Sequence, residues 1–184
     1  MAYRTGTYFA FDGQGQTNPA KSDFKYYATV KAWSSGKHID FNYVDSHEKT
    51  SAVRDSSKME TLKTRIRERL AASKNIVVIL SADTRDTGSM LSYEIEKAVD
   101  TYKIPLLITY TGYNSIMAPA ELYEMWPDAL RSRINSGAAK AIHLPFKKAV
   151  LLDAIEQFSV NKKLPTGSLD YYTRDTHVQW GYVQ

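Results

Sequence analysis

Hydrophobic and polar positions alternate along the chain in blocks that predict strands followed by helices. The clearest unit begins with Asn75-Ile-Val-Val-Ile-Leu80, a β-branched run typical of a strand buried on both faces of a parallel sheet. After a polar turn, Ser89 is predicted to cap a helix that continues to Tyr102. The apolar stripe of this helix consists of Leu91, Ile95, Ala98 and Tyr102. We expect the rest of the chain to be arranged around this β-loop-α unit.

The same patterns predict further elements on both sides of that unit. Strands are expected at residues 7–11, 39–44, 104–110 and 140–144. Helices are expected at residues 22–34, 57–72, 120–126, 128–134 and 146–158. The segment 177–183 is predicted either to add an edge strand or to lie across the body of the domain.

Five strands that alternate with helices predict an α/β fold with three layers and a parallel sheet. We expect the flavodoxin-like strand order 2-1-3-4-5, which places the loops after the first and third strands side by side. Asp12, Asp83, Asp86 and Glu94 would then lie on one rim of the sheet. Residues 1–160 are predicted to form this domain, with 161–184 as an extension packed on it.

Glu94 has two interpretations at this stage. Helical geometry places it about 60° from the centre of the apolar stripe, on the shoulder of the buried face and close to where ligands bind in open α/β sheets. The alternative is ordinary helix design, in which an acidic residue complements the helix dipole or pairs with Lys97 three residues later. Position alone favours the second interpretation.

Composition excludes several classes of protein. The 184 residues include no cysteine, which excludes disulfides, thiolate zinc sites and a cysteine nucleophile. The four histidines lack the spacing of metal ligands or of a catalytic triad, so no metal site is expected. No apolar run has the length of a signal peptide core or a membrane span, and we expect a cytoplasmic protein without a membrane partner. The net charge of +4 is scattered, which disfavours a nucleic acid partner.

Two other families with this architecture fit poorly. A phosphoacceptor receiver domain needs a lysine before the proline that follows the fifth strand, and Leu144 stands there. A flavodoxin needs a phosphate loop rich in Thr and Ser after the first strand, where this chain has a glutamine-rich loop. Function must therefore be argued from the residues at the rim.

Val78-Ile-Leu-Ser81, a loop, and a helix bearing Ser92-Tyr-Glu94-Ile95 resemble the segment in which enzymatic TIR domains carry their catalytic glutamate. The resemblance extends to the first strand, the second strand with Asp45 and the helix from Lys58, and it spans about residues 7–158. It is closest to divergent bacterial TIR-like proteins, such as the TIR subunit of Thoeris anti-phage defence.

The resemblance implies cleavage of the nicotinamide glycosidic bond of NAD, which gives ADP-ribose or a cyclic isomer used as a signal. NAD would be the substrate, with no other cofactor, and Glu94 the catalytic residue. The resemblance implies a set of substrate-binding residues, with Arg85 facing the pyrophosphate: Phe11, Asp12, Ser81, Asp83, Arg85 and Met90. Met90 departs from the pattern, because many active relatives have tryptophan four residues before the glutamate.

The resemblance also implies partners. In this family a neighbouring subunit often completes the pocket, so we expect self-association or a partner signalling protein. A non-enzymatic TIR-like adaptor that signals by self-association is the main alternative, with Glu94 only a charge near a helix terminus. A third possibility is cleavage of a nucleoside glycosidic bond other than that of NAD.

Overall fold

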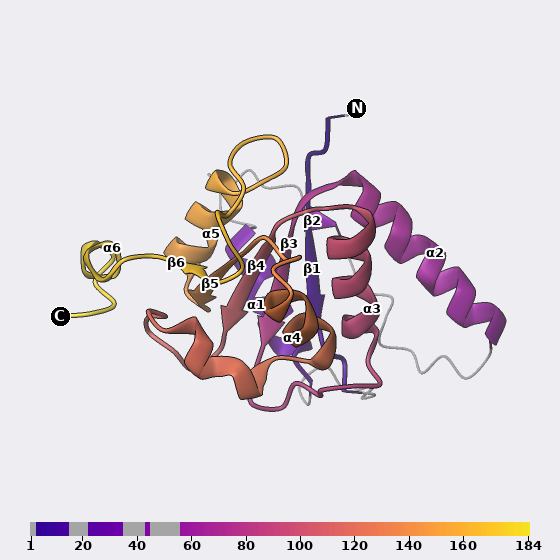
Figure 1. The fold of residues 1–184 in the computed structure, drawn as a ribbon, viewed down its shortest axis with the longest axis horizontal. Coiled ribbons are helices and arrows are strands. Elements are labelled where there is room, and N and C mark those ends of the chain that lie inside the picture. The colour runs from indigo at the N-terminus through magenta and orange to yellow at the C-terminus, as the bar shows by residue number, and fades with distance from the viewer. Residues whose placement is uncertain (1–2, 15–21, 35–42, 45–55) are drawn as a thin grey trace.

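A parallel sheet forms the centre of the computed structural model, which describes residues 3–14, 22–34, 43–44 and 56–184 (Figure 1). Within these residues the sheet has six strands in the order β2-β1-β3-β4-β5-β6, and each neighbouring pair is parallel. The strands are β1 (Gly6–Phe11), β2 (Tyr43–Val44), β3 (Ser73–Leu80), β4 (Leu106–Tyr110), β5 (Ala141–Pro145) and β6 (Asp170–Tyr171).

The α/β class and the parallel sheet are confirmed. The expectation of five strands is incomplete, because the short β6 adds a sixth beside β5. Residues 39–42 of the expected second strand lie outside the described residues, as does Asp45.

Helices connect the strands. They are α1 (Phe24–Ser34), α2 (Ser56–Ala72), α3 (Met90–Glu96), the π-helix η3 (Lys97–Thr101), the 3₁₀ helix η4 (Pro119–Met125), α4 (Asp128–Asn135), α5 (Lys148–Gln157) and α6 (Arg174–Gln179). The single helix expected from Ser89 to Tyr102 is therefore an α-helix that widens into a π-turn. The amide of Tyr102 donates to the carbonyl of Lys97, five residues back, which is the π-helical pattern.

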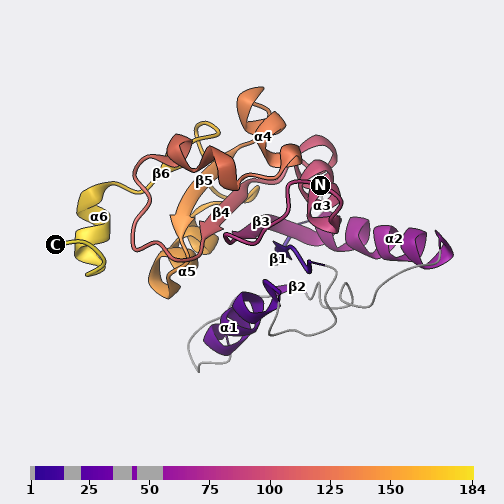
Figure 2. The same ribbon diagram turned by 90° about the horizontal axis from the view of Figure 1, so that it is seen from below.

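Two apolar cores pack on opposite faces of the sheet because side chains alternate along each strand. On β1, Tyr8 and Ala10 face the core beneath α2, α3 and α4, whereas Phe9 and Phe11 face the core beneath α1 and α5. Figure 2 shows α1 and α5 on one side of the sheet and α3 and α4 on the other. We call the side covered by α3 and α4 the α3 face, and the side covered by α1 and α5 the α1 face.

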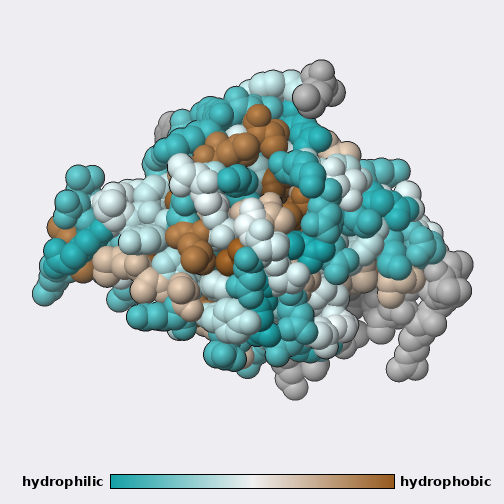
Figure 3. Space-filling view, viewed as in Figure 1, coloured by the Kyte–Doolittle hydropathy of each residue, from teal (hydrophilic) through white to brown (hydrophobic). Residues whose placement is uncertain are grey.

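Much of the surface seen in Figure 3 is hydrophilic, and hydrophobic residues gather near the middle of this view. The exposed large apolar side chains include three between β4 and α4: Tyr113, Met117 and Tyr123. No helix in the described part of the chain is long and apolar enough to cross a membrane.

Of the two alternatives for residues 177–183, the edge strand is wrong, because residues 174–179 form α6 and the added strand is β6. Thr173 caps α6, and its hydroxyl accepts a hydrogen bond from the amide of Thr176 at 3.4 Å. Gly181, with φ of 75°, follows the end of the helix, where a left-handed residue is favoured. In Figure 1, α6 lies at the end of the molecule opposite α2.

Candidate functional site

Glu94 lies inside the protein rather than on the shoulder of its helix. Leu91 and Ile95 of α3 are buried in the core of the α3 face, and Glu94 of the same helix is also buried, with 0% of its surface exposed. Its Oε1 accepts a hydrogen bond from the hydroxyl of Tyr8 on β1. Burial raises the pKa of Tyr8 far above its usual value, while the charge of Arg69 acts in the opposite direction. The Tyr8 hydroxyl therefore stays protonated and serves as a donor.

Lys97, the partner that ordinary helix design offers to Glu94, lies elsewhere. Its ammonium lies 5.5 Å from the ring centroid of Tyr93, in a cation–π contact. The hydroxyl of Tyr93 in turn accepts a hydrogen bond from Arg67 at 3.1 Å. These contacts belong to the surface of α2 and α3, whereas the carboxylate of Glu94 points to β1.

Asp12 and Arg85 form a second cluster at the carboxyl ends of β1 and β3. The guanidinium of Arg85 donates from Nε at 2.9 Å and from Nη2 at 2.7 Å to the two oxygens of Asp12. The amides of Arg85 and Gln14 also donate to this carboxylate, at 3.0 Å and 2.8 Å. Burial raises the pKa of Asp12, but these hydrogen bonds outweigh it, so the pKa lies below its usual value.

The sequence does not predict a role for Asp23, whose carboxylate binds two residues at the start of the loop after β3. Its oxygens accept hydrogen bonds from the hydroxyls of Ser81 at 2.6 Å and Thr84 at 3.1 Å. The residue is 1% exposed, and this burial raises its pKa despite the two donors. An acid immediately before a helix usually indicates a cap, so the pattern gave no sign of this contact.

The other predicted site residues are divided between the two faces and the surface. Phe11 lies on the α1 face, where its ring stacks on Tyr27 with centroids 5.4 Å apart. Met90 is half-buried against the core of the α3 face. Asp83 is exposed, and its amide donates to the Ser81 hydroxyl at 3.2 Å.

The four acidic residues expected on one rim therefore make separate contacts. The Oδ1 of Asp86 lies 3.8 Å from Nη2 of Arg131, and Arg131 also binds Asp128. The structure joins Asp12 to Arg85 and Ser81 to Asp83, but it does not bring Phe11 to the same face as Glu94. The expectation that four acids share one rim is wrong for Glu94, which lies deeper, against the middle of β1.

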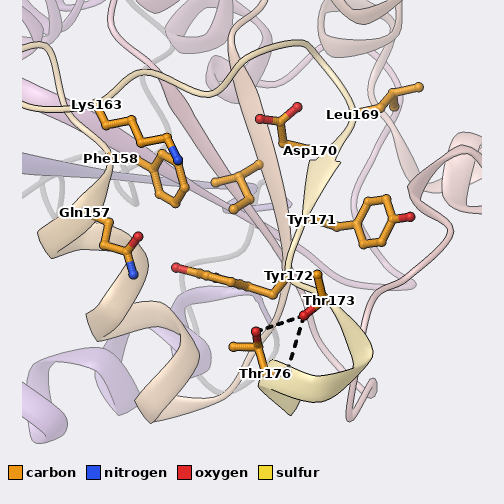
Figure 4. A pocket seen from close by; sticks show the side chains of 10 residues that line it. Gln157, Phe158, Lys163, Leu169, Asp170, Tyr171, Tyr172, Thr173 and Thr176 are labelled. Atoms are coloured by element: carbon orange, nitrogen blue, oxygen red, sulfur yellow. Dashed lines mark hydrogen bonds between the residues drawn. The ribbon is translucent and has the colours of Figure 1, made fainter. Parts of the chain in front are cut away.

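A cavity of about 400 Å³ lies at the other edge of the sheet (Figure 4). Its lining includes Ile142, Phe158 and Tyr172 from the α1 face, and Lys163 lies with its ammonium 5.6 Å from the Phe158 ring centroid. Tyr171 points away from the hollow. The C-terminal segment therefore builds a separate hollow and does not cover Glu94.

His143 on β5 has a structural environment. Its Nε2 lies 3.0 Å from the carbonyl of Ser168, which can only accept, so Nε2 carries the proton and Nδ1 accepts from the Tyr110 hydroxyl at 2.7 Å. Trp126 donates to the same hydroxyl oxygen at 2.7 Å. Burial lowers the pKa of His143 to about 4, so the ring is neutral at pH 7. Among the described residues, no group of three or more acidic or histidine side chains is placed to hold a metal ion.

The amino-acid sequence matches one family model, described as "Thoeris protein ThsB, TIR-like domain", over residues 8–115. The matched region is more than half of the 184-residue chain and runs from Tyr8 on β1 past the end of β4. It contains Glu94 and each of the other predicted site residues. The resemblance to TIR-like proteins is confirmed, and the chain belongs to the Thoeris ThsB TIR-like family.

Proposed function

We propose that this protein is a TIR-like signalling enzyme of bacterial anti-phage defence that cleaves the nicotinamide glycosidic bond of NAD. The observation that carries the proposal is the buried carboxylate of Glu94 in the second turn of the helix after β3, in a chain of the Thoeris ThsB family. The product would be ADP-ribose or a cyclic ADP-ribose isomer. No cofactor is needed, because NAD is the substrate.

The reaction requires stabilisation of positive charge. As the bond between C1′ of the ribose and the nicotinamide nitrogen breaks, its electron pair neutralises the pyridinium ring and the ribose becomes oxocarbenium-like. A fixed carboxylate beside the ribose stabilises that charge and holds the sugar hydroxyls. Water then adds to C1′ and loses a proton, which gives ADP-ribose. Attack by an oxygen or nitrogen of the same molecule, again with loss of a proton, gives a cyclic isomer.

The remaining residues of the proposed site have different roles. Arg85 is 43% exposed and is held by Asp12, so its guanidinium is a fixed cation that can meet a pyrophosphate. Met90 would offer an apolar contact in place of a stacking ring. Ser81 and Asp83 shape the loop that carries Arg85. Phe11 would support the site only from the opposite face, through its contact with Tyr27.

One observation favours the alternative of a non-enzymatic adaptor that acts by self-association or with a partner signalling protein. Glu94 exposes no surface and bonds to Tyr8, as a structural acid would. Catalysis therefore requires that NAD or assembly uncover this carboxylate. The adaptor hypothesis predicts that the Glu94→Ala protein associates with itself or its partner as wild type does. It also predicts no nucleotide turnover under any condition.

The decisive experiment measures nicotinamide release from NAD by the purified protein, alone and with extract of phage-infected cells. Glu94→Gln keeps the size of the side chain and removes its charge, and we expect a loss of at least 100-fold in kcat. Glu96→Gln is the matched control, because Glu96 is half-buried on the same helix and should keep the wild-type rate. Equal rates for Glu94→Gln and wild type would refute the assignment. The product mass separates hydrolysis from cyclisation, because ADP-ribose contains one water molecule more.

A further inference from the structure

We propose that Tyr8 is the positioning residue for Glu94, and that its hydroxyl fixes one carboxylate oxygen so that the acid, once uncovered, meets the ribose in a single orientation. The role in catalysis rests on the proposed function. The hydrogen bond itself joins residues 86 positions apart in sequence, and it is buried.

The position of Tyr8 suits this role because its backbone is held on both sides. Tyr8 pairs with Val44 of β2 and with Ile76 of β3, so the residue lies in the interior of the sheet. The side chain is 0% exposed and crosses the core toward α3. A hydroxyl carried by such a strand varies little in position, which is what a preorganised site requires.

The chemistry of the pair also favours a role in the reaction. A buried carboxylate tends to take up a proton, and a hydrogen bond donated to it favours the ionised form that an oxocarbenium-like state needs. Tyr8 keeps its own proton, because burial raises its pKa. The core cluster that contains Tyr8 also includes the apolar residues Ile76, Val78, Leu91 and Ile95.

Among charged groups, Arg69 has the largest effect on Tyr8. Arg69 of α2 is close enough for its charge to lower the pKa of Tyr8. On α4, Arg131 is bound to Asp128, and Arg133 is bound to Asp100 at the surface. Tyr8 thus donates to Glu94 from β1, and Arg69 of α2 is a cation near the pair.

The test compares Tyr8→Phe with Tyr93→Phe in the full-length protein. Both changes remove one phenolic hydroxyl, but that of Tyr93 contacts Arg67 rather than Glu94. We expect Tyr8→Phe to lower kcat for nicotinamide release at least tenfold with KM within twofold, and Tyr93→Phe to leave both constants within twofold. Unchanged kcat in Tyr8→Phe, or a rise in KM alone, would overturn the proposal.

A second readout does not depend on activity. Carboxyl ¹³C NMR titration should show a higher pKa for Glu94 in Tyr8→Phe than in wild type, by at least half a unit, and no change in Tyr93→Phe. An unchanged Glu94 pKa would overturn the role of Tyr8 even in an active enzyme. Conversely, a shifted pKa with no NAD cleavage in wild type would refute the proposed function and leave the positioning of Glu94 by Tyr8 intact.

Discussion

The guanidinium of Arg85 binds both carboxylate oxygens of Asp12, and this pair closes the carboxyl ends of β1 and β3. The acid is completely buried while 43% of the arginine side chain is exposed. Asp12 therefore holds the guanidinium of Arg85 in place, while solvent can still reach it. We propose that this fixed guanidinium meets the pyrophosphate of NAD.

Removal of either partner of this pair should destabilise the protein. Arg85→Met leaves a buried carboxylate with fewer donors, and we expect a loss of about 2 to 3 kcal/mol in the free energy of unfolding. In a double-mutant cycle with Asp12→Asn, the coupling should be about 1 to 2 kcal/mol by urea denaturation. The exposed pair Arg131–Asp128 is the control, and its coupling should stay below about 1 kcal/mol. Equal coupling in the two pairs would contradict the structure.

Loss of the Ser81 hydroxyl should loosen the loop that carries Arg85. Ser81→Ala removes a donor to Asp23 and an acceptor for the amide of Asp83, so we expect a cost of about 1 to 3 kcal/mol. The pKa of Asp23 should rise further, because one of its two donors is gone. Urea denaturation gives the first quantity, and NMR titration of Asp23 gives the second. A Ser81→Ala protein as stable as wild type would show that this contact contributes little.

The lowered pKa of His143 predicts that the stability of the protein depends on pH. Its folded pKa of about 4 lies below the unfolded value of 6.5, so the unfolded chain binds more protons between these values. The stability that His143 contributes is complete above pH 6.5 and is lost as pH falls through 4, by on the order of 3 kcal/mol.

Other groups titrate in the same range, and the raised pKa of Asp23 acts with the opposite sign. The informative quantity is therefore the difference between wild type and His143→Phe, measured by urea denaturation at pH 7.5 and pH 5. We expect the variant to lose less stability on acidification than wild type. Equal losses would mean that His143 is not held neutral by burial.

The C-terminal segment should contribute to stability without contributing to the proposed activity. Trp180 packs edge-on against Tyr172 with centroids 5.1 Å apart, and Tyr172 packs on Phe158. Trp180→Ala should lower the free energy of unfolding by about 2 kcal/mol, which thermal denaturation can measure. The rate of nicotinamide release per folded molecule should not change, since Trp180 and Tyr172 pack on the α1 face, opposite Glu94. A selective loss of activity would place the segment in the site.

Periodicity predicted the main layers of this fold but not its C-terminal edge. Strands such as β3 are buried on both faces, so a continuous β-branched run identifies them. The alternation of Val178, Trp180 and Tyr182 is compatible with a strand, whereas α6 ends at Gln179 and depends on its cap at Thr173 and on Gly181 beyond its end. Such local signals are easily outweighed by an aromatic, alternating pattern.

The site was predictable only in part, and the reason is tertiary contact. The sequence indicates that Glu94 follows a central strand, but it cannot show that Tyr8, 86 residues earlier, draws the carboxylate inward. It likewise cannot reveal that Asp23 binds Ser81 across 58 positions. The position of Phe11 at the end of β1 predicts a place in the pocket, whereas the alternation of side chains along that strand turns its ring to the opposite face.

The central claim is that the charge of Glu94 is required to break the nicotinamide glycosidic bond. The most direct measurement is the rate of nicotinamide release from NAD at equal concentrations of folded wild-type, Glu94→Gln and Glu96→Gln protein, with extract of phage-infected cells present. We predict release by wild type and Glu96→Gln, and a rate at least 100-fold lower for Glu94→Gln. Equal release by all three proteins, or none by wild type, would contradict the claim.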